Sequence, residues 1–153
     1  MRRAMFPWLL AAALLCGATA MAGAAADPEF GAYWHDGKAE LDGYRLTIDR
    51  YGHPRHGRAV AIYVTEPFSR SKHVKLDDPS KSPADALDVL KLNLVRDFQT
   101  GIYDYHTILS LFANSADFKP VKVAFSSSEW CGQVYEELVA SGSKLSQRVS
   151  SYF

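Results

Sequence analysis

The chain has few cysteines, no surplus of charge and no long hydrophobic run. It carries two cysteines among 153 residues, and 17 basic residues balance 17 acidic ones. Two thiols are too few for a small protein whose fold depends on a disulfide framework. The balanced charge also lacks the positive footprint of a nucleic-acid-binding protein, so nucleic acid is excluded as a partner.

Motifs of several enzyme classes are absent as well. There is no G-x-S-x-G turn and no S-x-x-K motif with a matching partner. A phosphate-binding loop, a dinucleotide fingerprint and an H-E-x-x-H helix are all missing. His53 and His56, with His35 upstream, offer a weak metal motif, but zinc needs three or four ligands. A solvated loop is the favoured interpretation, so we expect neither a cofactor nor a metal.

The N-terminus has the three zones of a secretory signal peptide. Arg2 and Arg3 are followed by an apolar run over residues 5–15 and by small residues over 17–26. The apolar run is shorter than the roughly 20 residues that a membrane-spanning helix needs. We therefore predict a signal peptide over residues 1–26, cleaved between about residues 22 and 26. Lipidation at Cys16 is not expected because Leu15, the residue before it, is not small.

Residues 27–153 then form one domain of an exported protein, either periplasmic or extracellular. This part has 15 basic and 17 acidic residues, and Cys131 is its only thiol. A chain of 127 residues can bury a core without disulfides. We expect no membrane span after the signal peptide is removed.

The pattern after residue 38 is that of strands separated by turns. Alternating or β-branched segments predict seven strands, at 44–49, 60–65, 90–98, 102–112, 121–125, 130–139 and 145–150. Such spacing is typical of an antiparallel meander, which would form a curved sheet, a partial barrel or a sandwich. Residues 27–38 are expected to be irregular, 52–57 a loop, 84–89 a short helix and 126–128 a turn, and Pro67 should end the second strand. Residues 135–139 could also be helical.

The last residues, 150–153, stop inside a strand pattern without a polar tail. An unpaired terminal strand favours aggregation. We therefore expect the chain to be the N-terminal part of a longer protein, with a genuine end tucked into the sheet edge as the alternative.

A basic run follows the second predicted strand. It contains Arg70, Lys72, His73 and Lys75. Loops after strands often carry function, and this one could bind an anion, a lipid headgroup or a cell-wall carboxylate. A solvated loop without function is the alternative.

Two further features offer chemistry. Trp130, Cys131 and Gly132 begin like a thioredoxin motif, but Val134 stands where the second cysteine would be, which excludes dithiol chemistry. We expect Cys131 to be a buried packing residue, with a reactive thiol as the alternative. His106 shares a predicted strand face with Asp104 and Ile108, which is a faint hint of acid–base chemistry.

Four phrases together resemble a known family. They are Val64–Ser69, Val89–Asn93, Thr100–Tyr105 and Glu129–Tyr135. In this order they resemble exported bacterial proteins of unknown function, over about residues 33–153. Members of that family continue well beyond the position that corresponds to Phe153. The resemblance therefore implies that this chain is part of a longer protein. Some relatives bear the name septum formation inhibitor Maf, but true Maf proteins are cytoplasmic nucleotide pyrophosphatases with an α/β fold and a Ser-x-Arg-Arg type motif, which this sequence lacks.

The sequence favours a non-catalytic binding or structural module of the bacterial envelope. An amphiphilic or anionic envelope component is the expected partner. The apolar face of its sheet is predicted to carry Leu46, Ile48, Val60, Ile62, Leu92, Leu94 and Val121. Candidate binding residues are Arg70, Lys72, His73, Lys75, Tyr103, Tyr105, Trp130 and Cys131. The alternative is an enzyme that uses Cys131 or His106.

Overall fold

The computed structural model describes residues 28–153, so the predicted signal peptide lies outside the described residues. Within residues 28–153, one short helix precedes seven strands, with a single 3-10 turn between the second and third strands. The elements are α1 (Pro28–Trp34), β1 (Glu40–Arg50), β2 (His53–Ser69), η1 (Pro79–Lys81), β3 (Ala86–Thr100), β4 (Tyr103–Asn114), β5 (Pro120–Glu129), β6 (Gly132–Ser141) and β7 (Lys144–Ser151).

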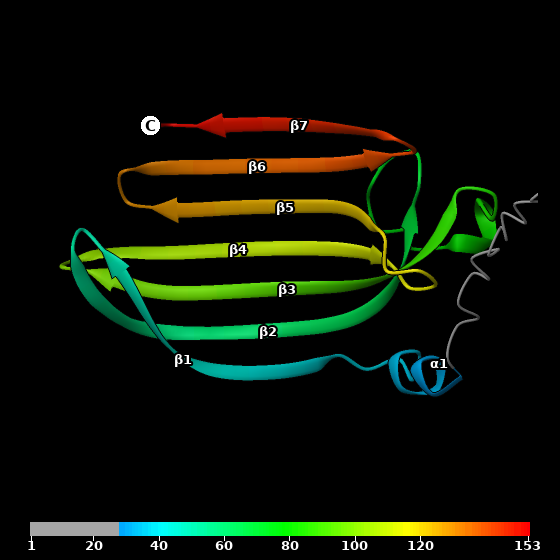
Figure 1. The fold of residues 1–153 in the computed structure, drawn as a ribbon, viewed down its shortest axis with the longest axis horizontal. Helices are drawn as coiled ribbons and strands as arrows, with labels where there is room; N and C mark the ends of the chain where they lie inside the picture. Colours follow the sequence, from blue (N-terminus) through cyan, green and yellow to red (C-terminus); the bar gives the residue numbers. More distant parts are fainter. Residues whose placement is uncertain (1–27) are drawn as a thin grey trace, which may run out of the picture.

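The described strands form one antiparallel sheet in the order β1 to β7 (Figure 1). Each strand pairs with the next one in the chain, and β1 and β7 are the two edges. The predicted mainly β meander is therefore confirmed. The described residues form a single curved sheet that does not close, and the sandwich alternative is wrong because the seven strands of residues 28–153 share that sheet.

Several predicted boundaries are wrong because the strands are longer than the apolar pattern suggested. Residues 53–57 belong to β2, so only Tyr51 and Gly52 make the first turn. Pro67 continues β2 opposite Asp88, and its carbonyl accepts from the Leu76 amide at 2.9 Å. Residues 126–128 lie inside β5.

The helix predictions are also corrected. Residues 86–89 begin β3, and the helical turn is η1, where the Asp78 carboxylate accepts from the Ser80 amide. The lead-in predicted as irregular contains α1. Residues 135–139 are strand, within β6.

Strand alternation sorts the side chains onto two faces of the sheet. Leu46 pairs with Gly57, whereas Val60 pairs with Gly43. Leu46, Ile48, Leu92 and Leu94 therefore share one face, but Val60 and Ile62 lie on the other. The predicted apolar face is wrong for Val60 and Ile62, because the long β2 fixes a register that the separated segments did not reveal. Val121 was also placed on the wrong face: it is the unpaired residue of a bulge opposite Phe112 and Ala113, and it packs against the buried cluster that contains Phe68.

The sheet rolls toward the face that carries Leu46. In a flat sheet β1 and β4 would lie about 14 Å apart, yet the hydroxyls of Tyr51 and Tyr105 are 3.0 Å apart. The guanidinium of Arg50 lies 5.2 Å from the centre of the Tyr105 ring. Figure 1 shows the second half of β1 crossing over its neighbours. We call this side the concave face and the opposite side the convex face.

A small core lies at one end of the convex face. Phe68 and Val89 are almost completely buried there, together with Leu87 and Phe112. Residues 70–85 cover this end, since the Lys122 ammonium on the convex face donates to the carbonyl of His73 at 3.2 Å. The rest of the convex face has no such cover in the described chain.

Candidate functional site

The concave face is apolar across its centre. Its side chains there are Leu92, Leu94, Leu109, Leu111, Val123 and Phe125. They stand in the middle of the sheet, yet none is fully buried, and Leu111 is 36% exposed. A sheet normally buries its apolar face against a second layer. No second layer lies over this centre in residues 28–153.

The hairpin end of the concave face is closed by aromatic rings. Phe98 and Tyr105 stack with ring centres 4.8 Å apart, and Arg50 lies over Tyr105. Burial, followed by a hydrogen bond with Glu129, raises the pKa of Tyr105 to about 12. The predicted candidate Tyr105 is thus a packed residue that is 5% exposed.

Helix α1 covers a second part of the concave face, at the opposite end of β2. The ring of Trp34 lies 6.0 Å from that of Tyr63, and the Thr65 hydroxyl donates to the Trp34 carbonyl. The His35 ring is 2.8 Å from the Asp88 carboxylate in β3. That contact is the first cause of a raised His35 pKa. No helix was predicted at α1, because seven residues are too few to show helical periodicity.

The basic run lies at the same end of the sheet as α1. The Asp85 carboxylate holds it, accepting from the Ser69 hydroxyl and from the Ser71 amide. Arg70 and His73 line a hollow of about 360 Å³, to which the β4–β5 turn adds Lys119. Lys72 and Lys75 do not line it. Two of the four predicted basic residues are therefore brought together.

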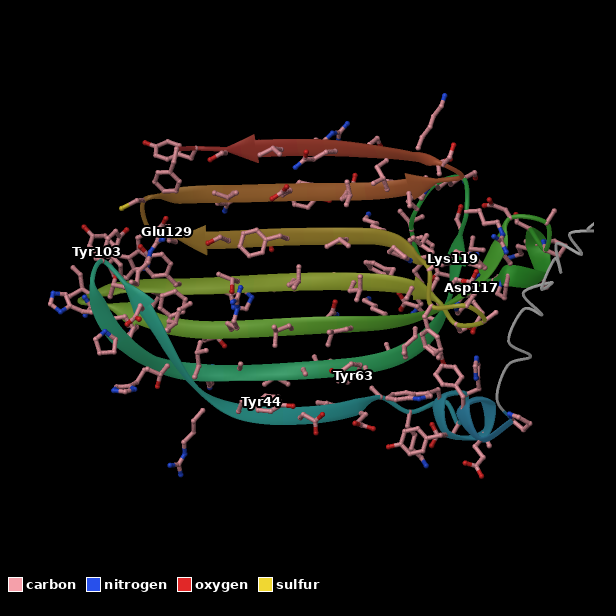
Figure 2. The ribbon with its side chains drawn as sticks, viewed as in Figure 1. Tyr44, Tyr63, Tyr103, Asp117, Lys119 and Glu129 are labelled. Carbon is pink, nitrogen blue, oxygen red and sulfur yellow. The ribbon has the colours of Figure 1, made fainter. Side chains whose placement is uncertain are left out.

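The remaining candidates lie at the other end of the strands. The rings of Tyr103 and Trp130 meet edge to face at 5.7 Å, and Cys131 follows in the β5–β6 turn. Figure 2 shows Tyr103 and Glu129 at this end and Asp117 and Lys119 at the opposite one. Because β3 has 15 residues, the two ends are about 45 Å apart. The predicted candidates therefore do not form one site.

Cys131 is exposed, so the expectation of a buried packing thiol is wrong. It falls in the turn between two strands rather than on a strand face. The predicted strand began at Trp130 and therefore included Cys131. The observed strand β6 begins at Gly132, so Cys131 lies just outside it.

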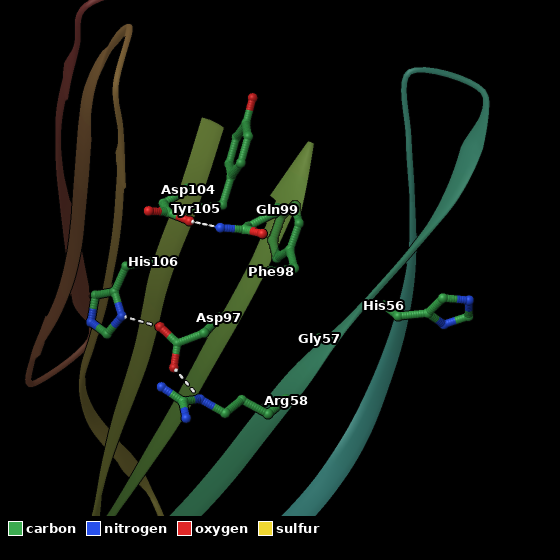
Figure 3. Close-up of a pocket in the computed structure, with 9 residues that line it drawn as sticks. All are labelled: His56, Gly57, Arg58, Asp97, Phe98, Gln99, Asp104, Tyr105 and His106. Atoms are coloured by element: carbon green, nitrogen blue, oxygen red, sulfur yellow. Dashed lines mark hydrogen bonds and ion pairs between the residues drawn. The ribbon is translucent and has the colours of Figure 1, made fainter. Parts of the chain in front are cut away.

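A polar hollow of about 560 Å³ lies on the convex face across β2, β3 and β4 (Figure 3). His106 shares it with Asp97, and their Nδ1 and Oδ1 atoms are 2.6 Å apart. Arg58 donates from Nε to the second oxygen of Asp97 at 3.3 Å. These two donors, His106 first, hold the pKa of Asp97 below its ordinary value.

The carboxylate beside His106 therefore comes from the neighbouring strand. The sequence pointed to Asp104, which does share the strand face with His106, but its carboxylate accepts from Gln99. Asp97 is directly opposite His106 in the register of β3 and β4. This pairing could not be seen before the register was known.

The metal motif does not assemble. His53 and His56 are three residues apart in β2, so they point to opposite faces. Residues 28–153 contain no group of three or more histidine, cysteine, aspartate or glutamate side chains that could hold a metal ion. No helix in this part of the chain has the length and apolar character to cross a membrane.

The fold and the concave face define a class: a mainly β protein whose single rolled sheet leaves an apolar surface open. Comparison with protein-family models, with curated proteins and with solved structures found no match to this chain.

Proposed function

We propose that this chain is an exported envelope protein that binds an apolar or amphiphilic ligand on its concave face without catalysis. The observation that carries the proposal is the half-exposed apolar centre of that face, from Leu92 in β3 to Phe125 in β5. Large exposed apolar surfaces commonly mark binding sites. The predicted signal peptide supports a place in the envelope.

The rolled shape of the sheet supports a ligand that is enclosed at both ends of the concave face. Arg50, Tyr51 and Tyr105 close one end of the concave face, and α1 covers part of the other. An apolar chain lying across the leucines of β3 and β4 would complete the missing layer. Burying apolar surface stabilises by about 25 cal/mol per Å², which favours such a cover.

The test is mass spectrometry of the full-length protein after expression and purification under non-denaturing conditions. We expect copurified lipid, released on denaturation, and a mature N-terminus between about residues 22 and 26. Exchange of Leu111 for Gln should reduce the lipid content, whereas Tyr135→Gln on the convex face should not. Leu111 and Tyr135 are matched in exposure, at 36% and 38%. Lipid-free protein that also fails to bind an apolar fluorescent probe would exclude this function.

An enzyme using His106 or Cys131 is the second candidate. The bond between Asp97 and His106 favours it, because a carboxylate that orients an imidazole is a frequent part of acid–base sites. Cys131 makes no hydrogen bond with His106 among the described residues, so the two are alternatives rather than a pair.

The rate of thiol labelling tests the cysteine version. Cys131 is exposed, so we expect an aromatic disulfide reagent to label it in the folded protein at neutral pH. If Cys131 is an ordinary thiol, it should react no faster in the folded protein than in the protein unfolded with urea. A clearly faster reaction in the folded state would indicate an activated nucleophile and would favour the enzyme.

A further inference from the structure

A single arginine lies beside the apolar centre of the concave face. Arg96 stands in β3 between Leu94 and Phe98 on that face, because side chains two residues apart on a strand point the same way. Its neighbours across the strands are Ala59 in β2 and Thr107 in β4. None of these four neighbours is charged, so the cation of Arg96 stands in neutral surroundings.

The guanidinium of Arg96 has no carboxylate partner. Its Nε donates to the Thr107 hydroxyl at 3.2 Å. Among residues 28–153, the ion pair that an arginine makes is that of Arg58 with Asp97, on the convex face. The terminal nitrogens of Arg96 are therefore free to donate to an added anion, and a carboxylate matches the fork of a guanidinium.

Two further arginines lie at the same end of the concave face. The guanidinium of Arg50 is over the ring of Tyr105, and Arg55 pairs with Ile48 on this face. The Nε of Arg55 is buried and has no hydrogen-bond partner within the described chain. Glu129 stands opposite Tyr105 and interacts with its hydroxyl. This end of the face therefore has more hydrogen-bond donors than acceptors.

The end of the concave face that α1 covers has acidic side chains instead. Asp88 in β3 contacts the His35 ring, and Glu40 in β1 accepts from the Tyr33 hydroxyl. A negatively charged group is disfavoured beside carboxylates and favoured beside unpaired arginines. The charges thus give the face a direction, with the anion-binding end at Arg96.

A row of leucines leads from Arg96 toward α1. Leu94, Leu92 and Leu90 follow Arg96 on the same face of the same strand, and β4 places leucines opposite the first two of them. The six residues from Arg96 to Leu90 span about 20 Å. Leu90 lies opposite Thr65, whose hydroxyl bonds to α1. One extended apolar chain can therefore contact the whole row without leaving the concave face.

We propose that the ligand is a long-chain carboxylate, whose head is bound by Arg96 and whose chain lies along the leucines of β3 with its methyl end toward α1. This assignment rests on the proposed function and adds the class of ligand and its orientation. Charge complementarity selects the carboxylate, and the row of leucines selects the chain.

The first experiment compares oleate with oleyl alcohol, which has the same chain and no charge. Each compound displaces a neutral, apolar fluorescent probe from the full-length protein. We expect oleate to bind more tightly than the alcohol. Arg96→Gln should weaken oleate binding roughly tenfold, the factor that a charged hydrogen bond contributes, and should leave the alcohol unchanged. Arg96→Lys keeps the charge and should keep the preference for oleate.

Arg45→Gln is the matched control, because Arg45 is exposed in β1 and pairs with Arg58 on the convex face. It should bind both compounds as the parent does. Equal loss of oleate and alcohol in Arg96→Gln, or no loss of either, would overturn the assignment while the proposed function stands. Loss of the preference for oleate in Arg96→Lys would overturn it as well. Failure of every apolar probe to bind would remove both proposals.

The second experiment tests the orientation with a fatty acid brominated at its methyl end, since bromine quenches the fluorescence of a tryptophan that it approaches. Trp34 belongs to α1, and Trp130 lies at the hairpin end beside Tyr103. We expect quenching in the parent protein that is lost in Trp34→Phe and kept in Trp130→Phe. Quenching that is lost in Trp130→Phe instead, or that is absent in the parent, would overturn the orientation.

Discussion

Asp97 shows how a single residue depends on strand register. Its carboxylate accepts from His106 in β4 and from Arg58 in β2, one on each side. Both bonds favour the charged carboxylate, which is why the pKa of Asp97 lies below the ordinary 3.8. These bonds therefore stabilise the folded protein at pH values above the ordinary pKa. The stabilisation is lost as the pH falls through the lowered pKa of Asp97.

We predict that His106→Ala raises the pKa of Asp97 toward its ordinary value, because the largest stabilising contact of the carboxylate is removed. Arg58→Ala should raise it less. Carboxyl ¹³C chemical shifts followed over pH 2–6 measure this directly. His56→Ala serves as the control, since His56 lines the same hollow but contacts Thr47 instead. An unchanged titration in His106→Ala would show that the contact does not form in solution.

The sequence identified candidate site residues by their type, but it did not identify the side chains that contact them in the fold. His106 was identified as a candidate, and its strand face with Asp104 and Ile108 was correct. Its true partner needed the pairing of β3 with β4. Arg70 and His73 were likewise identified, but Lys119 lies 46 or more residues away and joins them only through the fold. Local patterns carry no information on such contacts.

At the level of elements, all seven strands were predicted in the right order, and the errors lie at their ends. Strict alternation marks the half-buried middle of a strand, whereas the ends of β2 and β3 carry polar residues, Gly or Pro. Those residues signal turns when read locally. In β2 the cross-strand hydrogen bonds with its two neighbours outweigh that local preference.

Gly57 forms the first pair of the β2–β3 ladder, opposite Phe98. A methyl group at this position would stand 2.1 Å from the carbonyl oxygen of Asp97 and 2.8 Å from Cβ of Phe98. We therefore predict that Gly57→Ala destabilises the fold by about 1–3 kcal/mol, as overpacked sites do. Gly43 in β1 has open space around it, so Gly43→Ala should be neutral or slightly stabilising. Urea unfolding of the two variants compares them, and equal midpoints would contradict the close approach of β2 and β3.

Helix α1 is held to the sheet by a contact that responds to pH. His35 has a raised pKa because of Asp88, its largest influence, and the Gly31 carbonyl adds to it. The charged imidazole therefore stabilises the docked helix below pH 6.5, and this contribution is lost as pH rises through the raised pKa.

We predict that α1 is better protected at pH 5.5 than at pH 8.5. Hydrogen exchange of residues 28–35, corrected for the intrinsic rate at each pH, measures the difference. His35→Ala should remove the pH dependence, while His53→Ala, at the far end of the sheet, should keep it. Protection that is the same at both pH values in the parent protein would mean that the aromatic contacts of Phe30 and Trp34 alone hold the helix.

At the scale of the whole fold, the decisive property is that residues 28–153 form a single layer, where two layers are usual. The core of Phe68, Leu87, Val89 and Phe112 occupies only one end of the convex face, and the leucines of the concave face have no cover among residues 28–153. If an amphiphile supplies that cover, then removing it must expose the surface to whatever apolar partner is available, including a second copy of the chain.

We predict that lipid-stripped protein self-associates and that added oleate reverses this. Sedimentation velocity over a range of protein concentrations, with a reductant present because Cys131 is exposed, measures the association. Leu111→Gln should weaken it, because Leu111 lies at the centre of the concave face, whereas Tyr135→Gln, equally exposed on the convex face, should not. Association that is the same in Leu111→Gln would instead point to the open edge of β7, whose eight residues are all exposed, since unpaired edge strands also join copies of a chain. Protein that stays monomeric after stripping would show that the concave face needs no ligand to cover it, and would remove the reason for proposing one.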